Sequence, residues 1–164
     1  MNNIISFEDF LEARNTGINN NAFRLTGDWD NVKGTSNAVL LGSKDGYKVW
    51  RGFKSYIFVS DEDLNYLGSM SFDIENNETI WNVRSSDSLM KGGFYKLVYS
   101  ILFSKFPNIK ILSDDALSEL AIKSYTKLSK SGDFNVTIFD GTKNIPYDEE
   151  ILQSEPHYKV MVEK

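Results

Sequence analysis

The stretch from Ile80 to Leu128 decides the fold. It reads as the strand IWNVRSS (80–86), the glycine turn SLMKGG (88–93), the helix FYKLVYSILFSKF (94–106), the strand IKILSDD (109–115) and the helix ALSELAIKSYTKL (116–128). Two strands joined through a helix run parallel, and such crossovers are almost always right-handed. The first helix then begins at the carboxyl end of a strand, where backbone N–H groups and the helix dipole favour an anion.

Composition is that of an ordinary globular protein. The 164 residues fit one domain, and a chain of this size buries roughly 68–70% of its extended-chain surface. There is no cysteine and a single histidine, His157, which excludes disulfides, a thiolate nucleophile and a Cys- or His-cluster metal site. The net charge of −5 argues against non-specific nucleic-acid binding as the main role.

The sequence predicts no membrane partner. It contains no run of roughly 18 apolar residues, the length that a transmembrane helix requires. The first residues, MNNIISFEDFLEARN (1–15), are acidic and lack the basic and apolar regions of a secretory signal. We therefore expect a cytoplasmic protein.

Upstream of the deciding stretch, the pattern predicts a short helix and then an antiparallel meander. Ser6 is a suitable cap for a helix, and residues 15–37 are expected to be an irregular connection. Strands are expected at 38–41, 47–50, 54–60 and 66–74, and the last of these alternates cleanly between apolar and polar residues. Within it, Gly68 indicates a bulge. Trp29 and Trp50 have two interpretations, the lining of a substrate groove or a satellite apolar cluster.

Downstream, the pattern predicts two helices and two more strands. The helix from Gly93 to Phe106 ends before Pro107, and the next is expected to be capped by Asp114 or Asp115. The predicted apolar stripe of that second helix is Leu117, Leu120, Ala121, Tyr125 and Leu128. Strands follow at 134–139 and 158–162, with a polar loop between them.

These elements predict an α/β (mixed α+β) fold class. An antiparallel meander precedes a β-α-β-α-β unit in one mixed β-sheet, and helices cover both faces. We expect a single domain over residues 1–164, with a variable N-terminal part (1–53) and a core (54–162).

Residues 121–127, AIKSYTK, carry a family pattern. They match A-x-x-x-Y-x-K, with Gly132 and Phe134 following at a longer spacing, and Ser118 stands where the family often has Asn. With this pattern and with the element order over about residues 54–162, the chain resembles the GNAT superfamily of acetyltransferases. It resembles a divergent member of the bacteriophage type. The resemblance implies a GNAT-like fold and the transfer of an acetyl group from acetyl-CoA to an amine acceptor on a protein or a small molecule.

The resemblance also implies roles for three residues. Tyr125 would lie near the CoA sulfur and protonate the leaving thiolate as a general acid; the alternative is a core aromatic on the helix stripe. The pantetheine arm of acetyl-CoA would pair with the backbone of Val83 and Ser85 as an added strand does. A backbone N–H there would polarise the thioester carbonyl. The alternative is an ordinary central strand.

The phosphate turn departs from the family pattern, which is Gln or Arg, two residues, Gly, one residue, and Gly or Ala. With Gly92 taken as the first glycine, Leu89 replaces the Arg and Phe94 replaces the second glycine; with Gly93 first, Met90 and Tyr95 take those places. A bulky Phe94 or Tyr95 would hinder the approach of a diphosphate, whereas Lys91 supplies a point charge. The resemblance implies cofactor binding by Lys91, Gly92, Gly93 and Phe94; the alternative is a plain helix-start turn.

Two further questions stay open in the sequence. Asp73, Glu75 and Glu78 are candidates for a general base, or else solvated carboxylates beside a hairpin. The altered turn also permits a second function, a catalytically inactive GNAT-fold protein that acts by protein–protein interaction. Such a protein would be a phage-encoded host-factor inhibitor in the host cytoplasm, or a virion component.

Overall fold

The computed structural model describes residues 28–52, 55–75 and 77–164. The helix predicted at Ser6 lies outside these residues. In chain order the described elements are β1 (Val39–Lys44), β2 (Tyr47–Arg51), β3 (Tyr56–Asp61), β4 (Tyr66–Ile74), β5 (Ile80–Ser88), α3 (Phe94–Lys105), β6 (Lys110–Leu112), α4 (Glu119–Ser131), β7 (Asn135–Phe139), β8 (Asn144–Pro146), α5 (Glu149–Ser154) and β9 (Lys159–Glu163).

The described strands form one mixed sheet. Its nine strands follow the order β1-β2-β3-β4-β5-β6-β9-β7-β8. Strands β1 to β4 are an antiparallel meander, β5 and β6 are parallel, and β9 lies antiparallel between β6 and β7. The predicted fold class, a meander followed by a β-α-β-α-β unit with flanking helices, is therefore confirmed.

The chain divides into two compact units. Unit 1 comprises the residues up to Ser71 together with Ser86–Phe94, and unit 2 comprises Phe72–Ser85 together with Tyr95–Lys164. Strands β4 and β5 thus contribute residues to both units, and each unit is described by itself below.

The core of unit 1 is an aromatic cluster around Trp29. The Trp29 ring centroid lies 5.4 Å from that of Phe58 and 5.7 Å from that of Trp50. The indole N–H of Trp29 donates to the Leu64 carbonyl at 2.8 Å, so this fully buried side chain keeps its polar group paired. Of the two interpretations of Trp29 and Trp50, the apolar cluster is confirmed.

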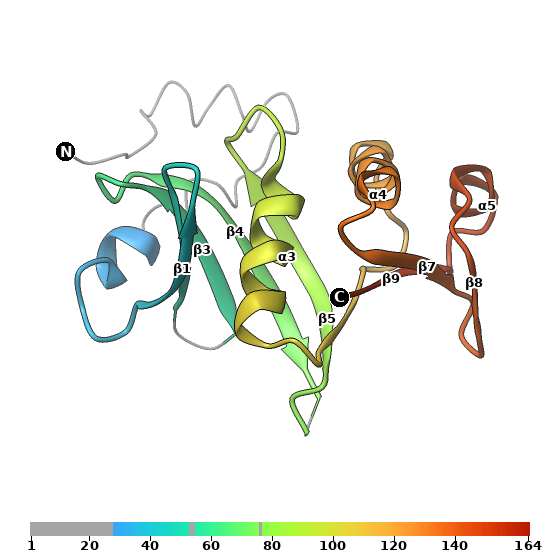
Figure 1. The fold of residues 1–164 in the computed structure, drawn as a ribbon, viewed down its shortest axis with the longest axis horizontal. Helices are drawn as coiled ribbons and strands as arrows, with labels where there is room; N and C mark the ends of the chain where they lie inside the picture. Colours follow the sequence, from blue (N-terminus) through green and yellow to red (C-terminus); the bar gives the residue numbers. More distant parts are fainter. Residues whose placement is uncertain (1–27, 53–54, 76) are drawn as a thin grey trace. The chain divides into compact units, whose positions relative to one another are not determined.

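The core of unit 2 is built from α3, α4 and the strands that they cover. Residue Trp81 of β5 packs between Phe72 of β4 and Phe106, which follows α3, at ring centroid distances of 5.2 and 5.3 Å. Helices α4 and α5 pack against each other, and α4 contacts β7 (Figure 1). The buried residues of α4 are Ile122, Tyr125 and Leu128.

The predicted start of α4 was wrong. The helix begins at Glu119, and its cap is Ser118, whose Oγ accepts a hydrogen bond from the Ala121 N–H at 3.1 Å. Neither Asp114 nor Asp115 caps it. Leu120, predicted on the apolar stripe, is 77% exposed, because it lies two residues, roughly 200° around the helix, from the buried Ile122.

The polar loop predicted between the last two strands was also wrong. It contains β8, which pairs with β7 and ends at Pro146, and the short helix α5. The side chain of Asp148 caps α5 by accepting from the Glu150 N–H at 2.9 Å. The predicted polar character is retained, since Leu152 is the buried residue of α5.

Candidate functional site

The pairing between β5 and β6, within unit 2, is short. The register comprises Ile80↔Lys110, Trp81↔Ile111 and Asn82↔Leu112. Beyond the last pair β6 ends, whereas β5 continues to Ser88. Two predicted cofactor residues, Val83 and Ser85, lie on this continuation; the Val83 side chain is buried and that of Ser85 is exposed. The β5–β6 pairing therefore ends just before the two residues with which the pantetheine arm was expected to pair.

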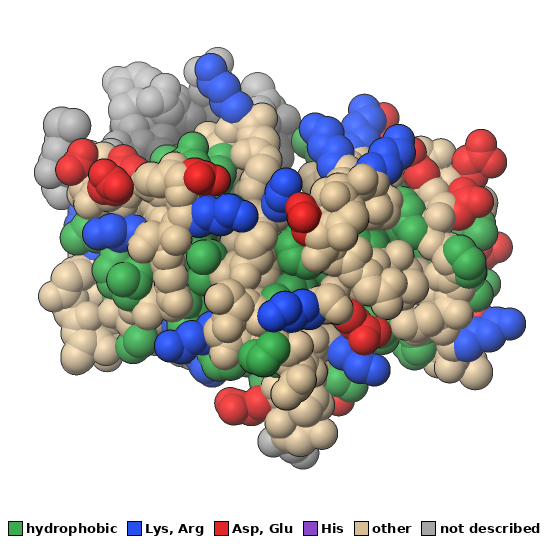
Figure 2. Space-filling view, in the orientation of Figure 1, with side chains coloured by type: hydrophobic (Ala, Val, Ile, Leu, Met, Phe, Trp, Pro, Cys, Tyr) green, Lys and Arg blue, Asp and Glu red, His purple; other side chains and the backbone are tan. Residues whose placement is uncertain are grey.

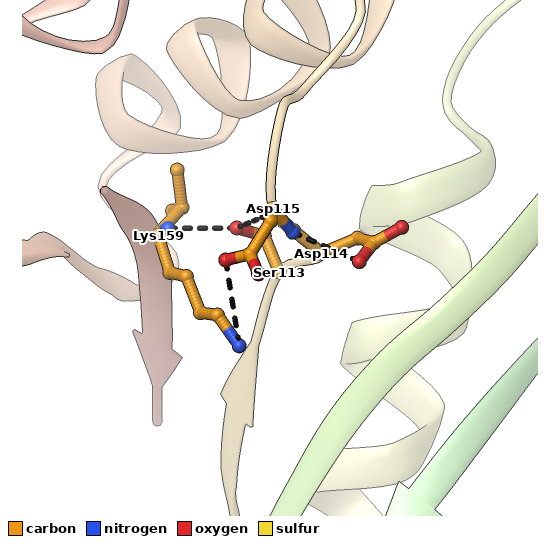
Figure 3. A network of polar contacts seen from close by, with 5 residues as sticks. Ser113, Asp114, Asp115 and Lys159 are labelled. Atoms are coloured by element: carbon orange, nitrogen blue, oxygen red, sulfur yellow. Dashed lines mark hydrogen bonds and ion pairs between the residues drawn. The ribbon is translucent and has the colours of Figure 1, made fainter. Parts of the chain in front are cut away.

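After Leu112 the chain stays with β9 instead of β5 (Figure 3). The Ser113 N–H donates to the Val160 carbonyl, and the Val160 N–H donates to Ser113 Oγ, both at 2.8 Å. An ion pair of 3.7 Å between Lys159 Nζ and Asp115 Oδ1 joins the same two segments. Asp114 Oδ1 accepts from the Asp115 N–H at 2.8 Å, so both carboxylates support the turn after β6.

Tyr125, the predicted general acid, is buried on α4. Its hydroxyl oxygen lies 2.8 Å from that of Tyr99 on α3, and its ring centroid lies 5.1 Å from that of Tyr95. Burial raises the pKa of Tyr125 well above its ordinary value, and the neighbouring Tyr99 and Tyr95 phenols add to this. The phenol thus stays protonated at neutral pH. This geometry is compatible with both interpretations of Tyr125, so its catalytic role stays a prediction.

The glycine turn of unit 1 has an open backbone. Gly92 and Gly93 have φ values of +154° and +76°, and a Cβ added at either would meet nothing within 4 Å. A side chain would be strained in this conformation, which explains the two glycines. Lys91 is exposed beside them. The turn leads directly into α3 at Phe94.

The bulky Phe94 is accommodated by Gly68. The Phe94 side chain is only 6% exposed, and its ring lies 2.7 Å from where a Gly68 Cβ would stand. Gly68 also marks an irregularity in the β3–β4 register, which passes from Val59↔Gly68 to Ser60↔Tyr66. The predicted bulge is confirmed, and the missing side chain makes room for the Phe94 ring.

The candidate general bases lie at the hairpin between β4 and β5. Asp73 pairs with Arg84 at 3.3 Å, and both side chains are more than half exposed. Glu78 has a φ of +55° in the turn. These features are those of solvated hairpin carboxylates, and the general base stays a prediction.

The lysine of the family pattern, Lys127, is exposed on α4. It lies on the same solvent-facing side as Lys123 and Lys130, and Figure 2 shows basic side chains gathered over this helix. Lys123 pairs with Glu119 one turn earlier, at 3.3 Å. Lys127 therefore adds surface charge, while Tyr125 and Leu128 face inward.

Sequence reasoning missed Tyr99, Ser113 and the role of Gly68. For Tyr99 a signal existed, since Tyr95 and Tyr99 are four residues apart and share a helix face. For Ser113 the signal was weak, a polar residue directly after the apolar run of β6.

Two other site classes are addressed by the described residues. Within them, no group of three or more His, Cys, Asp or Glu side chains is placed to hold a metal ion. The helices of this part of the chain include none long and apolar enough to cross a membrane.

No family model and no curated protein matches this chain. Among solved structures, the chain is similar to a protein described as a GNAT-family acetyltransferase from Bacteroides thetaiotaomicron, with 15% identity over 72% of this chain and a TM-score of 0.39. It is also similar to the N-terminal domain of a ribosomal-protein-alanine acetyltransferase from Clostridium acetobutylicum, with 11% identity and a TM-score of 0.37, over 76% of this chain and 93% of that one. The chain spans 61% of the length of the Bacteroides protein.

Proposed function

We propose that this chain is a GNAT-like N-acetyltransferase that passes an acetyl group from acetyl-CoA to an amine. The observation that carries the proposal is the end of the β5–β6 pairing at Asn82 and Leu112. Strand β6 ends at this pair, whereas β5 continues to Ser88. Pantetheine is an extended arm with two amide groups. Such a segment can pair with strand backbone as an added strand does.

In the proposed reaction Val83, Ser85 and Tyr125 each have a role. The amine nitrogen attacks the thioester carbonyl, the C–S bond breaks, and the CoA thiolate leaves. The backbone of Val83 and Ser85 holds the arm, and an N–H there stabilises the oxyanion. Tyr125 gives its phenol proton to the thiolate and regains a proton from the amine through solvent.

The diphosphate of acetyl-CoA is assigned to the turn before α3. Backbone N–H groups of Gly92, Gly93 and Phe94 at a helix start favour an anion, and Lys91 adds a positive charge. The open space beside both glycines and the burial of the Phe94 ring support this assignment. The position of the Phe94 ring beside Gly68 supports an anion site at this turn in spite of the bulky side chain.

Isothermal titration with acetyl-CoA and with CoA tests the proposal directly, followed by thiol release in the presence of a panel of amines. Heat of binding and amine-dependent CoA release are expected. Gly93→Ala should weaken binding, whereas Gly46→Ala should not, although Gly46 also has a positive φ of +83° and open space beside it. No heat at millimolar ligand from the folded chain would remove the proposal.

That negative result would favour the alternative, a catalytically inactive GNAT-fold protein that acts on a protein partner. The departure of residues 89–94 from the family turn supports this alternative. A divergent bacteriophage-type member in the host cytoplasm fits the Asn- and Lys-rich composition. A pull-down from host lysate that recovered no specific partner would then count against it.

A further inference from the structure

The hydrogen bonds of Ser113 depart from a regular antiparallel ladder. The register Ile111↔Val162 and Leu112↔Met161 places Ser113 opposite Val160. The bond from the Ser113 N–H to the Val160 carbonyl makes these two residues a hydrogen-bonded pair, and such a pair normally exchanges both N–H···O=C bonds. Here the Val160 N–H donates to Ser113 Oγ. The hydroxyl thus replaces the carbonyl of its own residue.

This replacement lets the backbone leave the sheet without unpairing Val160. Ser113 is 1% exposed, and its hydroxyl donates in turn to the Asp114 carbonyl at 3.2 Å. Both the acceptor and the donor capacity of the hydroxyl are therefore used. Three residues later Ala116 has a φ of +50°, and its N–H donates to the Pro156 carbonyl at 3.0 Å, so the chain has turned away from the strand direction.

The turn occurs at the residue that would otherwise continue the pairing with β5. Because Asn82 is paired with Leu112, the next parallel pair would be Val83 with Ser113. The carbonyl of Ser113 is released from the β6–β9 ladder at this point. The chain bends there, before Asp114, the next residue whose backbone would face β5. A strand that went on here would cover the edge of β5 beside Val83.

We propose that Ser113 is the positioning residue of the pantetheine site: its hydroxyl ends β6 and so keeps β6 from covering β5 beyond Asn82. That the ligand here is pantetheine rests on the proposed function. The hydrogen bond from the Val160 N–H to the Ser113 hydroxyl, in place of the Ser113 carbonyl, does not depend on the proposed function.

Ser60 provides a matched control in unit 1. It is fully buried, accepts a hydrogen bond from the Trp50 indole N–H at 2.9 Å and donates to the next carbonyl, that of Asp61, at 2.9 Å. Ser60→Ala therefore also removes a buried hydroxyl that accepts from an N–H and donates to the next carbonyl, in strands other than β5 and β6. Ser113→Thr is the conservative variant that keeps the hydroxyl.

The experiment compares full-length wild type, Ser113→Ala, Ser113→Thr and Ser60→Ala by amide hydrogen exchange and by titration with two probes. S-acetyl-pantetheine carries only the arm, and ADP carries only the diphosphate end. In Ser113→Ala we expect the Val160 amide to exchange about tenfold faster or more, since a buried N–H loses its acceptor. We expect roughly tenfold weaker binding of S-acetyl-pantetheine and unchanged binding of ADP, because only the arm depends on strand pairing.

Ser113→Thr should restore both properties, and Ser60→Ala should leave both unchanged. Wild-type exchange at Val160 in Ser113→Ala would overturn the inference, and so would wild-type affinity for S-acetyl-pantetheine in that variant. A wild-type chain that binds no acetyl-CoA would instead overturn the proposed function. Fast Val160 exchange in Ser113→Ala would even then establish that the Ser113 hydroxyl holds the Val160 N–H.

Discussion

The hydroxyl groups of Tyr99 and Tyr125 lie 2.8 Å apart, and both side chains are buried. This bond joins α3 to α4 within unit 2. Burial raises the pKa of both phenols, so both are protonated over the physiological range. Their mutual bond uses one of two O–H protons, which leaves the other for a second acceptor.

Replacing Tyr125 by Phe tests the general-acid role. We expect kcat for acetyl transfer to fall by roughly 10²–10⁴-fold, the usual contribution of a positioned acid, with acetyl-CoA affinity retained. Tyr147→Phe is the control, because the Tyr147 hydroxyl lies 2.8 Å from Thr126 Oγ1 on the same helix. An unchanged kcat in a folded Tyr125→Phe variant would identify Tyr125 as a core aromatic only.

Replacing Tyr99 by Phe tests the energetic value of the phenol pair. The Tyr125 hydroxyl would remain buried without this partner, which costs about 1–3 kcal/mol in the free energy of unfolding. Urea denaturation measures the loss. In the double variant Tyr99→Phe/Tyr125→Phe the loss should be smaller than the sum of the two single losses, since neither hydroxyl is then stranded. Simple additivity would show that the pair contributes no coupling.

Stability should fall at alkaline pH. Burial raises the pKa of Tyr66, Tyr99 and Tyr125 above the ordinary value. A raised pKa in the folded state means that this stability is complete below the unfolded-state pKa of about 10 and is lost as the pH rises above it. Urea denaturation between about pH 8 and pH 11 measures this slope. The slope should be shallower in Tyr125→Phe, and an identical slope would contradict the assignment.

Adding a methyl group at Gly68 should destabilise unit 1. The new Cβ would stand 2.7 Å from the Asp87 carbonyl oxygen and 2.7 Å from the Phe94 ring. Overpacking of this kind costs about 1–3 kcal/mol, measured by denaturation of Gly68→Ala. Phe94→Leu in the same chain should recover only part of the loss, because the contact with the Asp87 backbone remains. Full recovery would locate the whole cost at the ring.

The helix cap at Ser118 can be separated from the aspartates that precede it. Ser118→Ala should cost about 0.5–2 kcal/mol, since the Ala121 N–H loses its acceptor. Asp114→Ala removes only the local bond to the Asp115 N–H, and its effect on the thermal midpoint should be smaller. A larger loss of stability in Asp114→Ala than in Ser118→Ala would instead identify Asp114 as the cap.

Strand alternation and clear stop signals made much of the fold predictable. The run 66–74 matches β4, and Pro107 follows the end of α3 as expected. Other elements gave no such signal. Helix α5 is a single short segment, and β8 contains a proline that only an edge position tolerates. The phase of α4 was misjudged because Leu120 is apolar, yet the buried face of this helix carries Ile122, Tyr125 and Leu128, and Leu120 lies on the opposite side.

The candidate site was less predictable because it depends on contacts between distant segments. A family pattern indicates Tyr125, but its partner Tyr99 is 26 residues away. The end of the β5–β6 pairing coincides with the bond between Ser113 and Val160 of β9, 47 residues along the chain. Neither contact can be predicted from local sequence, because each forms only when distant segments pack together.

Pro146 has a consequence for how copies of this chain meet. It is the last residue of β8, which is an edge strand of the described sheet. Proline has no backbone N–H that could donate to an added strand. A strand from another copy that paired with β8 would meet an edge of only three residues, one of which lacks an N–H donor. Short margins of this kind discourage fibre growth by edge-to-edge stacking.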